Sequence, residues 1–256
     1  MDARRSLEAN TWSGSLSLSP GMVIYAGPGG SAVKHSHHAI QFIRSFDSPF
    51  QLNLEGRTRT CSAALVPSGV SHSFECSAEH VLLALIEPLG PNGSELNRIA
   101  VEAAGACLDS ISPTRIDQTA NPQIAVRDVV DALSRNTRIE TAAELSPHVV
   151  SALQYLDGAI EGKPRIKDAA SAAGISPSRL THLFTQQVGM PFKKFVLWLR
   201  LRRVVESVSQ GENLTSSAHS AGFSDSAHLS RVFRENFGLS PSALTSMDIS
   251  PDPWPV

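Results

Sequence analysis

Several features are scarce in this chain of 256 residues, and each absence excludes a class of protein. Aromatic residues make up only 6% of the sequence, and the three cysteines lack the Cys-x-x-Cys spacing of a zinc or redox site. We therefore expect Cys61, Cys76 and Cys107 to be reduced thiols in a cytoplasmic protein. The sequence contains no apolar run long enough for a transmembrane helix. Its first residues lack the apolar stretch of a signal peptide, so we expect no membrane partner.

Sequence motifs of the common enzyme classes are also missing. We find no phosphate-binding Walker loop, no Gly-x-Gly-x-x-Gly after a strand, no Gly-x-Ser-x-Gly elbow and no His-Glu-x-x-His helix. The apolar fraction of 41% is that of a folded globular protein, and the length favours two domains over one. We therefore expect a folded multidomain protein that is not an enzyme.

Net charge is small but unevenly distributed. The total of −2 would argue against a nucleic-acid partner if it were spread evenly along the chain. Residues 1–146 carry 11 basic and 15 acidic side chains, whereas residues 147–245 carry 11 and 7, which gives −4 and +4. The tail, residues 246–256, contributes −2. The C-terminal region is therefore basic, but only modestly, which predicts weak non-specific affinity for DNA.

Hydrophobic patterning divides the chain into regions. In residues 1–92, short apolar runs such as Ala39–Arg44 and Val81–Ile86 alternate with Gly, Pro and Ser, which predicts an all-β sandwich or small barrel. In residues 93–146 the pattern becomes helical, with helices expected at Glu95–Leu108 and Ile124–Leu133 that could form a dimer contact or cover the barrel. Short helices joined by Gly turns fill residues 147–245, and the Pro-rich tail, residues 246–256, cannot be helical.

The most specific feature is an internal repeat within residues 147–245. The segment Ala173–Arg179 matches Ala221–Ala227 at an offset of 48. After one inserted residue, Leu180, Phe184 and Gly189 match Leu229, Phe233 and Gly238 at an offset of 49. Each copy is a helix, a Gly-centred turn and a second helix that ends at a glycine, which is the helix-turn-helix pattern.

The positions that match between the two copies each have a physical role. Gly174 and Gly222 can adopt the left-handed conformation that closes a helix. We expect the hydroxyls of Ser176 and Ser224 to cap the helix that follows. The segment between the copies, Phe192–Ser209, predicts a helix of about 27 Å, comparable with the spacing of about 34 Å between successive turns of DNA.

These motifs resemble those of the AraC/XylS family of bacterial transcription regulators. The resemblance covers about residues 148–245 and rests on Ala173–Leu180, the linking Leu199–Arg203, and the second block from Gly222 to Ser242. It implies a DNA-binding module with two reading helices and, for the whole chain, a sensor domain before this module. One segment departs from the family: Leu214–Ser220 is a poor helix former, and Ser217 replaces a buried aliphatic residue, so we expect this half to be less stable or to bind DNA more weakly.

The resemblance also implies roles for individual side chains. Candidates for reading base edges lie early in the two second helices, and they are Ser178, Arg179, Thr181, His182, Ser226, His228, Ser230 and Arg231. Candidates for contacting phosphates are the basic side chains Lys193, Lys194, Arg200, Arg202, Arg203 and Arg234.

A group of histidines lies in the N-terminal region. His35 and His37, then Gln41, and then His72 after Pro67-x-Gly69 resemble the two motifs of the cupin barrel, with Gln41 in place of the family's carboxylate. The resemblance implies either a small-molecule effector pocket or a transition-metal site for Zn, Fe, Ni, Cu or Mn. Purely structural histidines are the third alternative, and His38 is expected to face outward.

Taken together, the sequence predicts an α+β multidomain protein: an all-β cupin-like barrel, a helical linker region and an all-α double helix-turn-helix domain. Its expected function is DNA-binding transcription regulation, as activator or repressor, in response to a small molecule or metal, with no required cofactor. Expected partners are double-stranded DNA, a second copy of the chain and, for an activator, RNA polymerase. The alternative function is a cupin-type metal-dependent oxygenase or isomerase fused to a DNA-binding module.

Overall fold

The computed structural model describes residues 12–19, 21–89, 93–102, 108 and 145–251. The chain forms two compact units: one comprises Met1–Glu140 with Arg234–Val256, and the other comprises Thr141–Phe233. The structure thus counts residues 234–245 with the β-rich unit, whereas the sequence pattern grouped them with the helical region. Because their placement depends on strand pairing far along the chain, local sequence patterns do not reveal it.

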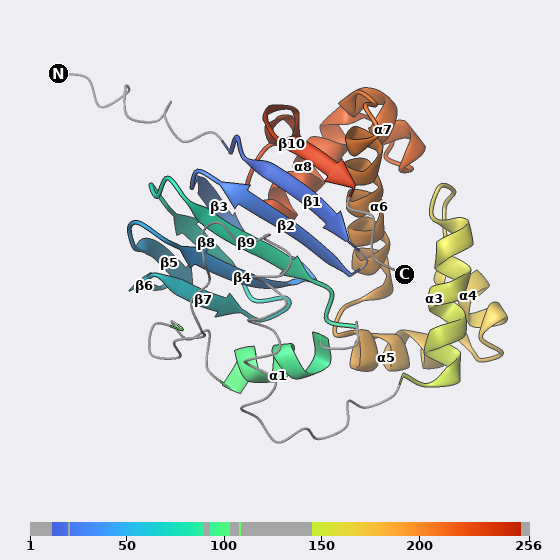
Figure 1. Cartoon of the computed structure of the whole chain (residues 1–256). Coiled ribbons are helices and arrows are strands. Elements are labelled where there is room, and N and C mark those ends of the chain that lie inside the picture. The colour runs from blue at the N-terminus through green and yellow to red at the C-terminus, as the bar shows by residue number, and fades with distance from the viewer. Residues whose placement is uncertain (1–11, 20, 90–92, 103–107, 109–144, 252–256) are drawn as a thin grey trace. The chain divides into compact units, whose positions relative to one another are not determined.

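The β-rich unit contains a six-stranded sheet (Figure 1). Its strands, in spatial order, are β10 (Asp248–Pro251), β1 (Ser15–Ser19), β2 (Met22–Gly27), β9 (Val81–Ile86), β4 (Ile40–Ser45) and β7 (Ala63–Val66). Neighbouring strands are antiparallel except for the parallel pair of β10 and β1. The non-helical tail predicted from its prolines therefore supplies an edge strand as far as Pro251.

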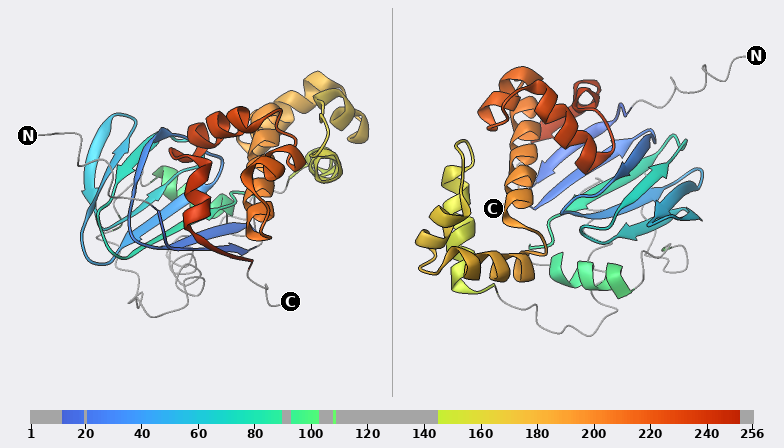
Figure 2. Two further views of the ribbon diagram at one scale, coloured as in Figure 1. Left: turned by 90° about the horizontal axis from the view of Figure 1, so that it is seen from above. Right: turned by 180° about the vertical axis from the view of Figure 1, so that it is seen from behind.

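A second, four-stranded sheet belongs to the same unit (Figure 2). Its order is β3 (Ser31–His35), β8 (His72–Glu75), β5 (Phe50–Leu54) and β6 (Arg57–Cys61). Among the described strands, no hydrogen-bonded pair joins the two sheets, so the predicted closed cupin-like barrel is not confirmed. Short strands at regular spacing suit sandwiches and barrels alike, and closure depends on pairings that the sequence pattern does not specify.

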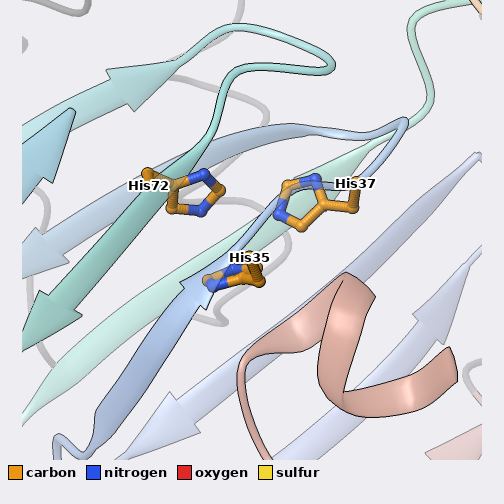
Figure 3. A group of neighbouring side chains, drawn as sticks. All are labelled: His35, His37 and His72. Carbon is orange, nitrogen blue, oxygen red and sulfur yellow. The ribbon is translucent and has the colours of Figure 1, made fainter. Parts of the chain in front are cut away.

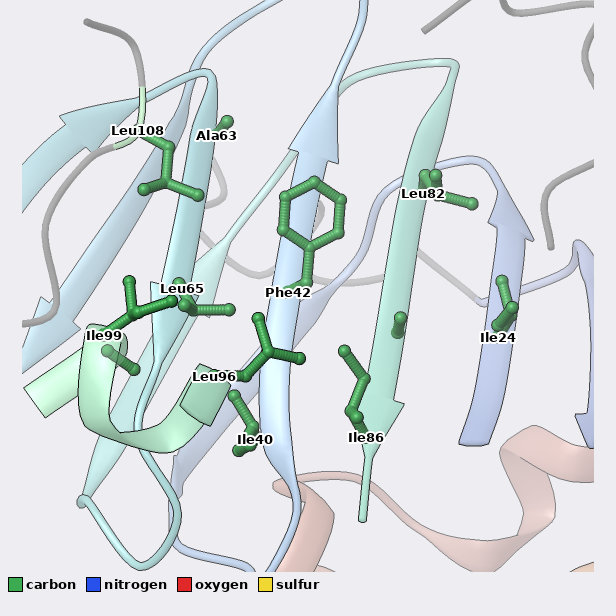
Figure 4. Close-up of a cluster of buried hydrophobic side chains, with 12 residues drawn as sticks. Ile24, Ile40, Phe42, Ala63, Leu65, Leu82, Ile86, Leu96, Ile99 and Leu108 are labelled. Carbon is green, nitrogen blue, oxygen red and sulfur yellow. The ribbon is translucent and has the colours of Figure 1, made fainter. Parts of the chain in front are cut away.

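One face of the six-stranded sheet packs against helix α1 (Gly93–Glu102). Leu96 and Ile99 of this helix join a buried cluster with Ile40, Phe42 and Leu65 of the sheet (Figure 4). Side chains alternate along a strand, so Gln41, between Ile40 and Phe42, projects to the opposite face. This alternation directs one polar side chain away from the apolar cluster and toward the second sheet.

The expected linker helices and the expected reduced cysteines can be compared with the structure. Helix α1 is confirmed over the described Gly93–Glu102, whereas residues 103–107 of the expected Glu95–Leu108 and the helix expected at Ile124–Leu133 lie outside the described residues. The expectation of three reduced thiols is wrong: Cys61 is disulfide-bonded and Cys76 is free and buried. Cys-x-x-Cys spacing detects only pairs that are close in the sequence, so it gave no signal for this bond.

The helical unit contains the predicted short helices. They are α3 (Pro147–Ala159), α4 (Ile166–Ala172), α5 (Pro177–Val188), α6 (Phe192–Ser209), α7 (Leu214–Ser220) and α8 (Ser226–Phe237). The last turn of α8 belongs to the β-rich unit, where a 3-10 helix at Pro241–Ser246 follows it. The ring of Phe184 meets those of Phe192 and Phe195 edge to face, with centroids 5.3 and 5.5 Å apart. Among the described helices, none has the length and apolar character needed to cross a membrane.

Candidate functional site

The two helix-turn-helix copies have matching backbone geometry at the turns. In the first copy, Gly174 has a φ of +68° and its N–H donates to Ser171 O at 3.1 Å. In the second copy, Gly222 has a φ of +82° and its N–H donates to His219 O at 3.0 Å. The residue after each glycine also donates to a helix carbonyl, Ile175 to Ala170 O and Phe223 to Ala218 O. All four pairs are 48 residues apart, so the repeat seen in the sequence is also a repeat in structure.

The second helix of each copy begins with a side-chain cap, but the two caps differ. Ser176 accepts a hydrogen bond from Arg179 N–H at 3.3 Å, as predicted. At α8 the prediction for Ser224 is wrong, because Asp225 Oδ1 accepts from His228 N–H at 2.7 Å and the Ser224 hydroxyl donates to Asp225 Oδ2. These hydrogen bonds lower the pKa of Asp225, and the one from His228 N–H has the largest effect. A carboxylate also complements the positive end of the helix better than a hydroxyl does.

On α5 the predicted base-reading side chains share one exposed surface of the helix. Ser178, Arg179, Thr181 and His182 are all exposed. The hydroxyl of Thr181 donates to Pro177 O at 2.8 Å, which occupies its proton. Arg179 has the long side chain and the paired donors needed to reach a guanine edge.

On α8 the predicted residues differ in how freely they can reach a partner. His228 is half-buried, lies edge to face against Phe223 with centroids 5.2 Å apart, and has Nδ1 3.2 Å from Ser224 Oγ. Ser230 is half-buried, whereas Ser226 and Arg231 are exposed. Arg231 is therefore the α8 candidate for direct base contact, at the position that matches His182 in the repeat.

The candidate phosphate contacts also separate into two groups. Lys193 and Lys194 are exposed in the first turn of α6, and Arg234 is exposed near the end of α8. Arg200 instead donates to Gly162 O at 2.6 Å and Ile160 O at 3.4 Å, and its partial burial lowers its pKa.

The remaining two arginines of α6 lie next to carboxylates. The Arg203 guanidinium donates to the Glu161 carboxylate, and Arg202 lies 3.9 Å from Glu206. Arg200 also lies close to the turn of the second copy. A β-carbon added at Gly222 would be 3.0 Å from the Arg200 guanidinium, so α6 packs closely against this turn. The sequence analysis did not predict that Arg200 positions the turn of the second copy. Glycine at position 222 was the available signal, because a larger residue would contact Arg200 there.

Ser217 is a structural anomaly in the second copy. Helix α7 forms despite its polar sequence, because Asn213 Oδ1 caps it by accepting from Ser216 N–H at 2.9 Å. The Ser217 side chain is fully buried, and its hydroxyl has no hydrogen-bond partner among the described residues. An unpaired buried hydroxyl destabilises a folded unit, which agrees with the expectation that this half is weaker.

A second candidate site lies in the β-rich unit, where the predicted histidines converge. His35 ends β3, His72 begins β8, and His37 lies in the segment after β3 (Figure 3). All three are at most 5% exposed, and one ring nitrogen of each lies within 4.8 Å of the others. Gln41 of β4 reaches the same point: its Oε1 is 2.9 Å from His37 Nε2 and 3.3 Å from His72 Nε2. The group of four, which we call the histidine cluster, therefore joins side chains from both sheets.

Hydrogen bonds to backbone carbonyls fix the tautomer of each ring in the histidine cluster. Nδ1 lies 2.7 Å from Val33 O in His35, 2.8 Å from Ala39 O in His37 and 2.9 Å from Val70 O in His72. A carbonyl oxygen can only accept, so in the neutral ring each Nδ1 carries the proton and each Nε2 is an acceptor. The Nε2 atoms of His37 and His72 both lie near Gln41 Oε1.

Burial keeps the imidazoles of the histidine cluster neutral. Loss of hydration lowers the pKa of His35 to about 4 and that of His72 to about 2, and in each case the charge of the neighbouring histidines lowers it further. Burial also lowers the pKa of His37, and the contacts of its ring with Gln41 Oε1 and the Ala39 carbonyl offset only part of this effect. At neutral pH the cluster therefore presents uncharged ligands, which is the form that binds metal ions.

The histidine cluster is packed against residues that follow α8 in the same unit. Val33 N–H donates to Gly238 O at 3.1 Å, and Ser36 N–H donates to Glu235 O at 3.2 Å. The rings of His37 and Phe237 have centroids 6.3 Å apart. These contacts join the strand that carries His35 to the last turn of a helix that also carries Arg231. No local sequence signal indicated them.

Two other histidines behave differently from the cluster. The prediction that His38 faces outward is wrong: it is 1% exposed and its Nε2 lies 2.9 Å from Glu87 Oε1. Strand β3 ends at His35, so the alternation expected of a strand does not extend to His38. An exposed group of Asp47, Glu79 and His80 also has closely spaced ligand atoms, but Asp47 Oδ2 already accepts from the N–H groups of the other two residues.

Comparisons with known proteins agree with this geometry. Residues 169–247 match the family described as "Helix-turn-helix domain". The regulatory protein PocR of Salmonella typhimurium is 28% identical over 102 residues, which cover 38% of this chain and only 34% of PocR. The probable transcriptional regulator LumQ of Photobacterium leiognathi is 20% identical over 226 residues, or 83% of this chain and 91% of LumQ. A crystal structure of ToxT from Vibrio cholerae has a TM-score of 0.56 at 11% identity and covers 90% of this chain and 99% of that one, which shows a shared fold.

Proposed function

We propose that this chain, whose residues 169–247 match the helix-turn-helix family, is a sequence-specific, DNA-binding transcription regulator of the AraC type. The observation that carries the proposal is the duplicated turn, with the same two backbone hydrogen bonds and a left-handed glycine at positions 48 residues apart. Two such turns present two second helices, α5 and α8, each with an exposed arginine near its start. A helix of this kind enters the major groove and reads base edges from its first turns.

Within this function, Arg179 and Arg231 are the candidates for reading bases, and Lys193 and Lys194 for contacting phosphates. The two arginines are exposed and can each donate a bidentate pair of hydrogen bonds to guanine. The lysines stand in the first turn of α6 and can hold the backbone by charge without reading sequence. We assign Arg200 to positioning instead, because its guanidinium donates to two backbone carbonyls.

We further propose that the β-rich unit senses an effector at the histidine cluster. This site combines several buried polar side chains in a domain whose other buried residues are mostly apolar. A protein of similar fold, ToxT, has been crystallised with a bound unsaturated fatty acid, which supports an effector-binding role for this chain. The backbone hydrogen bonds from the β3 segment to Glu235 and Gly238 offer a direct route from the cluster to the end of α8.

Dimer formation and recruitment of RNA polymerase by an activator remain parts of this proposal, as does action in the cytoplasm, where the DNA is. The alternative function, a metal-dependent oxygenase or isomerase, needs a substrate that can reach the ion. Each histidine of the cluster is at most 5% exposed, which favours sensing over turnover.

The test is selection of bound fragments from a genomic library by the purified full chain, followed by sequencing. We expect enrichment of a common sequence motif, and its loss in the double variant Arg179→Ala, Arg231→Ala. The matched control is the double variant Arg57→Ala, Arg59→Ala, which removes the same two charges from β6. Enrichment of the same motif by the double variant would contradict the proposed function.

A further inference from the structure

Two arginines of the edge strand β6 lie on the side of the four-stranded sheet that carries its buried residues. Arg59 is paired in register with Leu52 of β5, and Arg57 is paired with Leu54. Residues that stand directly opposite each other on neighbouring strands point to the same side of a sheet. Leu52 and Leu54 are at most 8% exposed, so both arginines extend from the inward side of the sheet, where charged residues are rare.

A pocket of about 440 Å3 opens beside these two arginines. Its apolar lining comes from β5, from the turn between β7 and β8, and from α1, and its polar lining comes from the β5–β6 hairpin. The lining residues are Leu54, Pro67, Val70, Val101, Glu55, Arg57 and Arg59. Sites for small organic ligands are typically about 300–1,000 Å3 in volume, so this pocket is large enough for one.

The two arginines have hydrogen-bond donors to offer to a ligand. Neither Arg57 nor Arg59 forms an ion pair or a side-chain hydrogen bond with another residue in the described part of the chain. A strand rises about 3.3 Å per residue, so the two residues are about 7 Å apart along β6, and their long side chains can both reach one anionic group. Each guanidinium carries five N–H donors in a planar fork that matches a carboxylate.

Inward-pointing charges at the edge of a sheet also have another use, which is to prevent pairing with a second chain. That use needs the charges of the strand alone. It does not explain why apolar residues from β5, the β7–β8 turn and α1 meet beside the arginines in one pocket. The combination of unpaired guanidinium groups with an apolar wall favours a ligand that has both an anionic group and an apolar body.

We infer that this pocket, which we call the arginine pocket, binds a small organic acid with one carboxylate and an apolar body. Arg57 and Arg59 against Glu55 give the lining a net charge of 2 − 1 = +1, which matches a monovalent anion. The guanidinium groups would hold the carboxylate through charge-assisted hydrogen bonds, and the apolar wall would contact the body. The inference rests on the proposed function, since it gives the sensing unit a class of effector and a binding site that adjoins the histidine cluster.

The turn Pro67–Val70 connects the arginine pocket to two other parts of the β-rich unit. His72 Nδ1 donates to Val70 O at 2.9 Å, so the turn holds one ring of the histidine cluster. Ser68 N–H donates to Asn97 Oδ1 of α1 at 2.9 Å, so the turn is also bonded to the first helix of the linker region. A ligand that packs against this turn therefore contacts a segment joined to both the cluster and α1.

The experiment is titration calorimetry of the full chain with octanoate, and with octanamide as its uncharged analogue of the same size. We expect one octanoate per chain and an affinity for octanamide at least about tenfold lower, because the amide cannot form charge-assisted hydrogen bonds. Arg59→Ala should lower the affinity for octanoate at least about fivefold. The matched control Lys34→Ala removes one exposed positive charge from β3 of the same sheet, outside the pocket lining, and should bind octanoate as wild type does.

Val101→Glu tests the apolar side of the pocket independently. Val101 is 59% exposed, so the substitution leaves the core intact, and circular dichroism establishes that each variant is folded. The added carboxylate should weaken octanoate binding at least about fivefold by repulsion between like charges. Absence of saturable octanoate binding by wild type, equal affinity for octanamide, equal affinities of Arg59→Ala and Lys34→Ala, or an unchanged affinity of Val101→Glu would each overturn the inference.

The inference and the proposed function can fail separately, because octanoate binding is measured without DNA and motif selection is measured without octanoate. If the chain selects a DNA motif but does not bind octanoate, the regulator stands and the arginine pocket does not. If the chain binds octanoate in a manner that depends on Arg59 but selects no DNA motif, the pocket stands and the proposed function fails.

Discussion

Replacing Ser217 by alanine is expected to stabilise the second helix-turn-helix copy. The side chain is fully buried in α7, and its hydroxyl has no hydrogen-bond partner among the described residues. The cost of leaving such a group unpaired is about 1–3 kcal/mol. Alanine also favours a helix over serine by about 0.5 kcal/mol. Loss of one oxygen leaves little empty space, so we expect a net gain of about 1–2 kcal/mol in the free energy of unfolding of this unit.

Amide hydrogen exchange in the full chain measures this change locally, which avoids treating two units as one transition. A gain of about 1.4 kcal/mol slows exchange of the globally protected amides in α7 and α8 about tenfold. The matched control is Ser216→Ala, the exposed neighbour on the same helix, which changes helix propensity alone. Its expected slowing is about twofold. Equal slowing in the two variants would refute the argument that the buried hydroxyl of Ser217 is destabilising.

Further predictions concern the reading helix, the phosphate contacts, the end of α8 and pH. Arg231→Ala should cost about 1–3 kcal/mol of specific binding and relax the preference at one base pair; an equal loss on random DNA, measured by competition, would contradict base reading. Lys193→Ala with Lys194→Ala should weaken binding to all sequences and flatten the dependence of affinity on salt, and an unchanged salt slope would remove both lysines from the phosphate contacts. Gly238→Ala should lower the stability of the β-rich unit in urea titrations, because φ is +72° there and a β-carbon would overlap a backbone carbonyl of β3; stability equal to wild type would contradict this packing. The pKa of His35 is about 4 in the folded protein, below the ordinary 6.5, so the unfolded chain binds more protons between these values. Unfolding free energy should therefore fall by roughly 3 kcal/mol between pH 6.5 and 4, and urea titrations that give constant stability over this range would contradict the buried, neutral ring.

The sequence could predict the helix-turn-helix geometry because that geometry is local. Gly174 and Gly222 close their turns with bonds to residues three positions earlier, and such short-range contacts leave a repeated pattern in the sequence. The histidines could be grouped for a similar reason, since His35 and His37 are close neighbours and the Pro67-x-Gly69 turn precedes His72. Even so, the cluster includes Gln41 only because this side chain reaches across from the other sheet.

Other features depended on pairings that no local pattern encodes. The two sheets are open because of strand partners far apart in sequence, as in the parallel pairing of Ser15 with Asp248. His38 is buried because β3 ends before it, and a strand boundary is among the least certain features of a sequence. The choice of Asp225 over Ser224 as the cap depended on a shift of one residue in where α8 begins.

The central claim is that α5 and α8 read DNA as a pair. Hydroxyl-radical footprinting of the full chain on a selected genomic fragment tests it most directly. The account predicts two protected segments separated by about 34 Å, one turn of DNA, with Arg179→Ala and Arg231→Ala each weakening a different segment. Protection without position preference, or loss of both segments equally in each single variant and in the control Arg57→Ala, would contradict it.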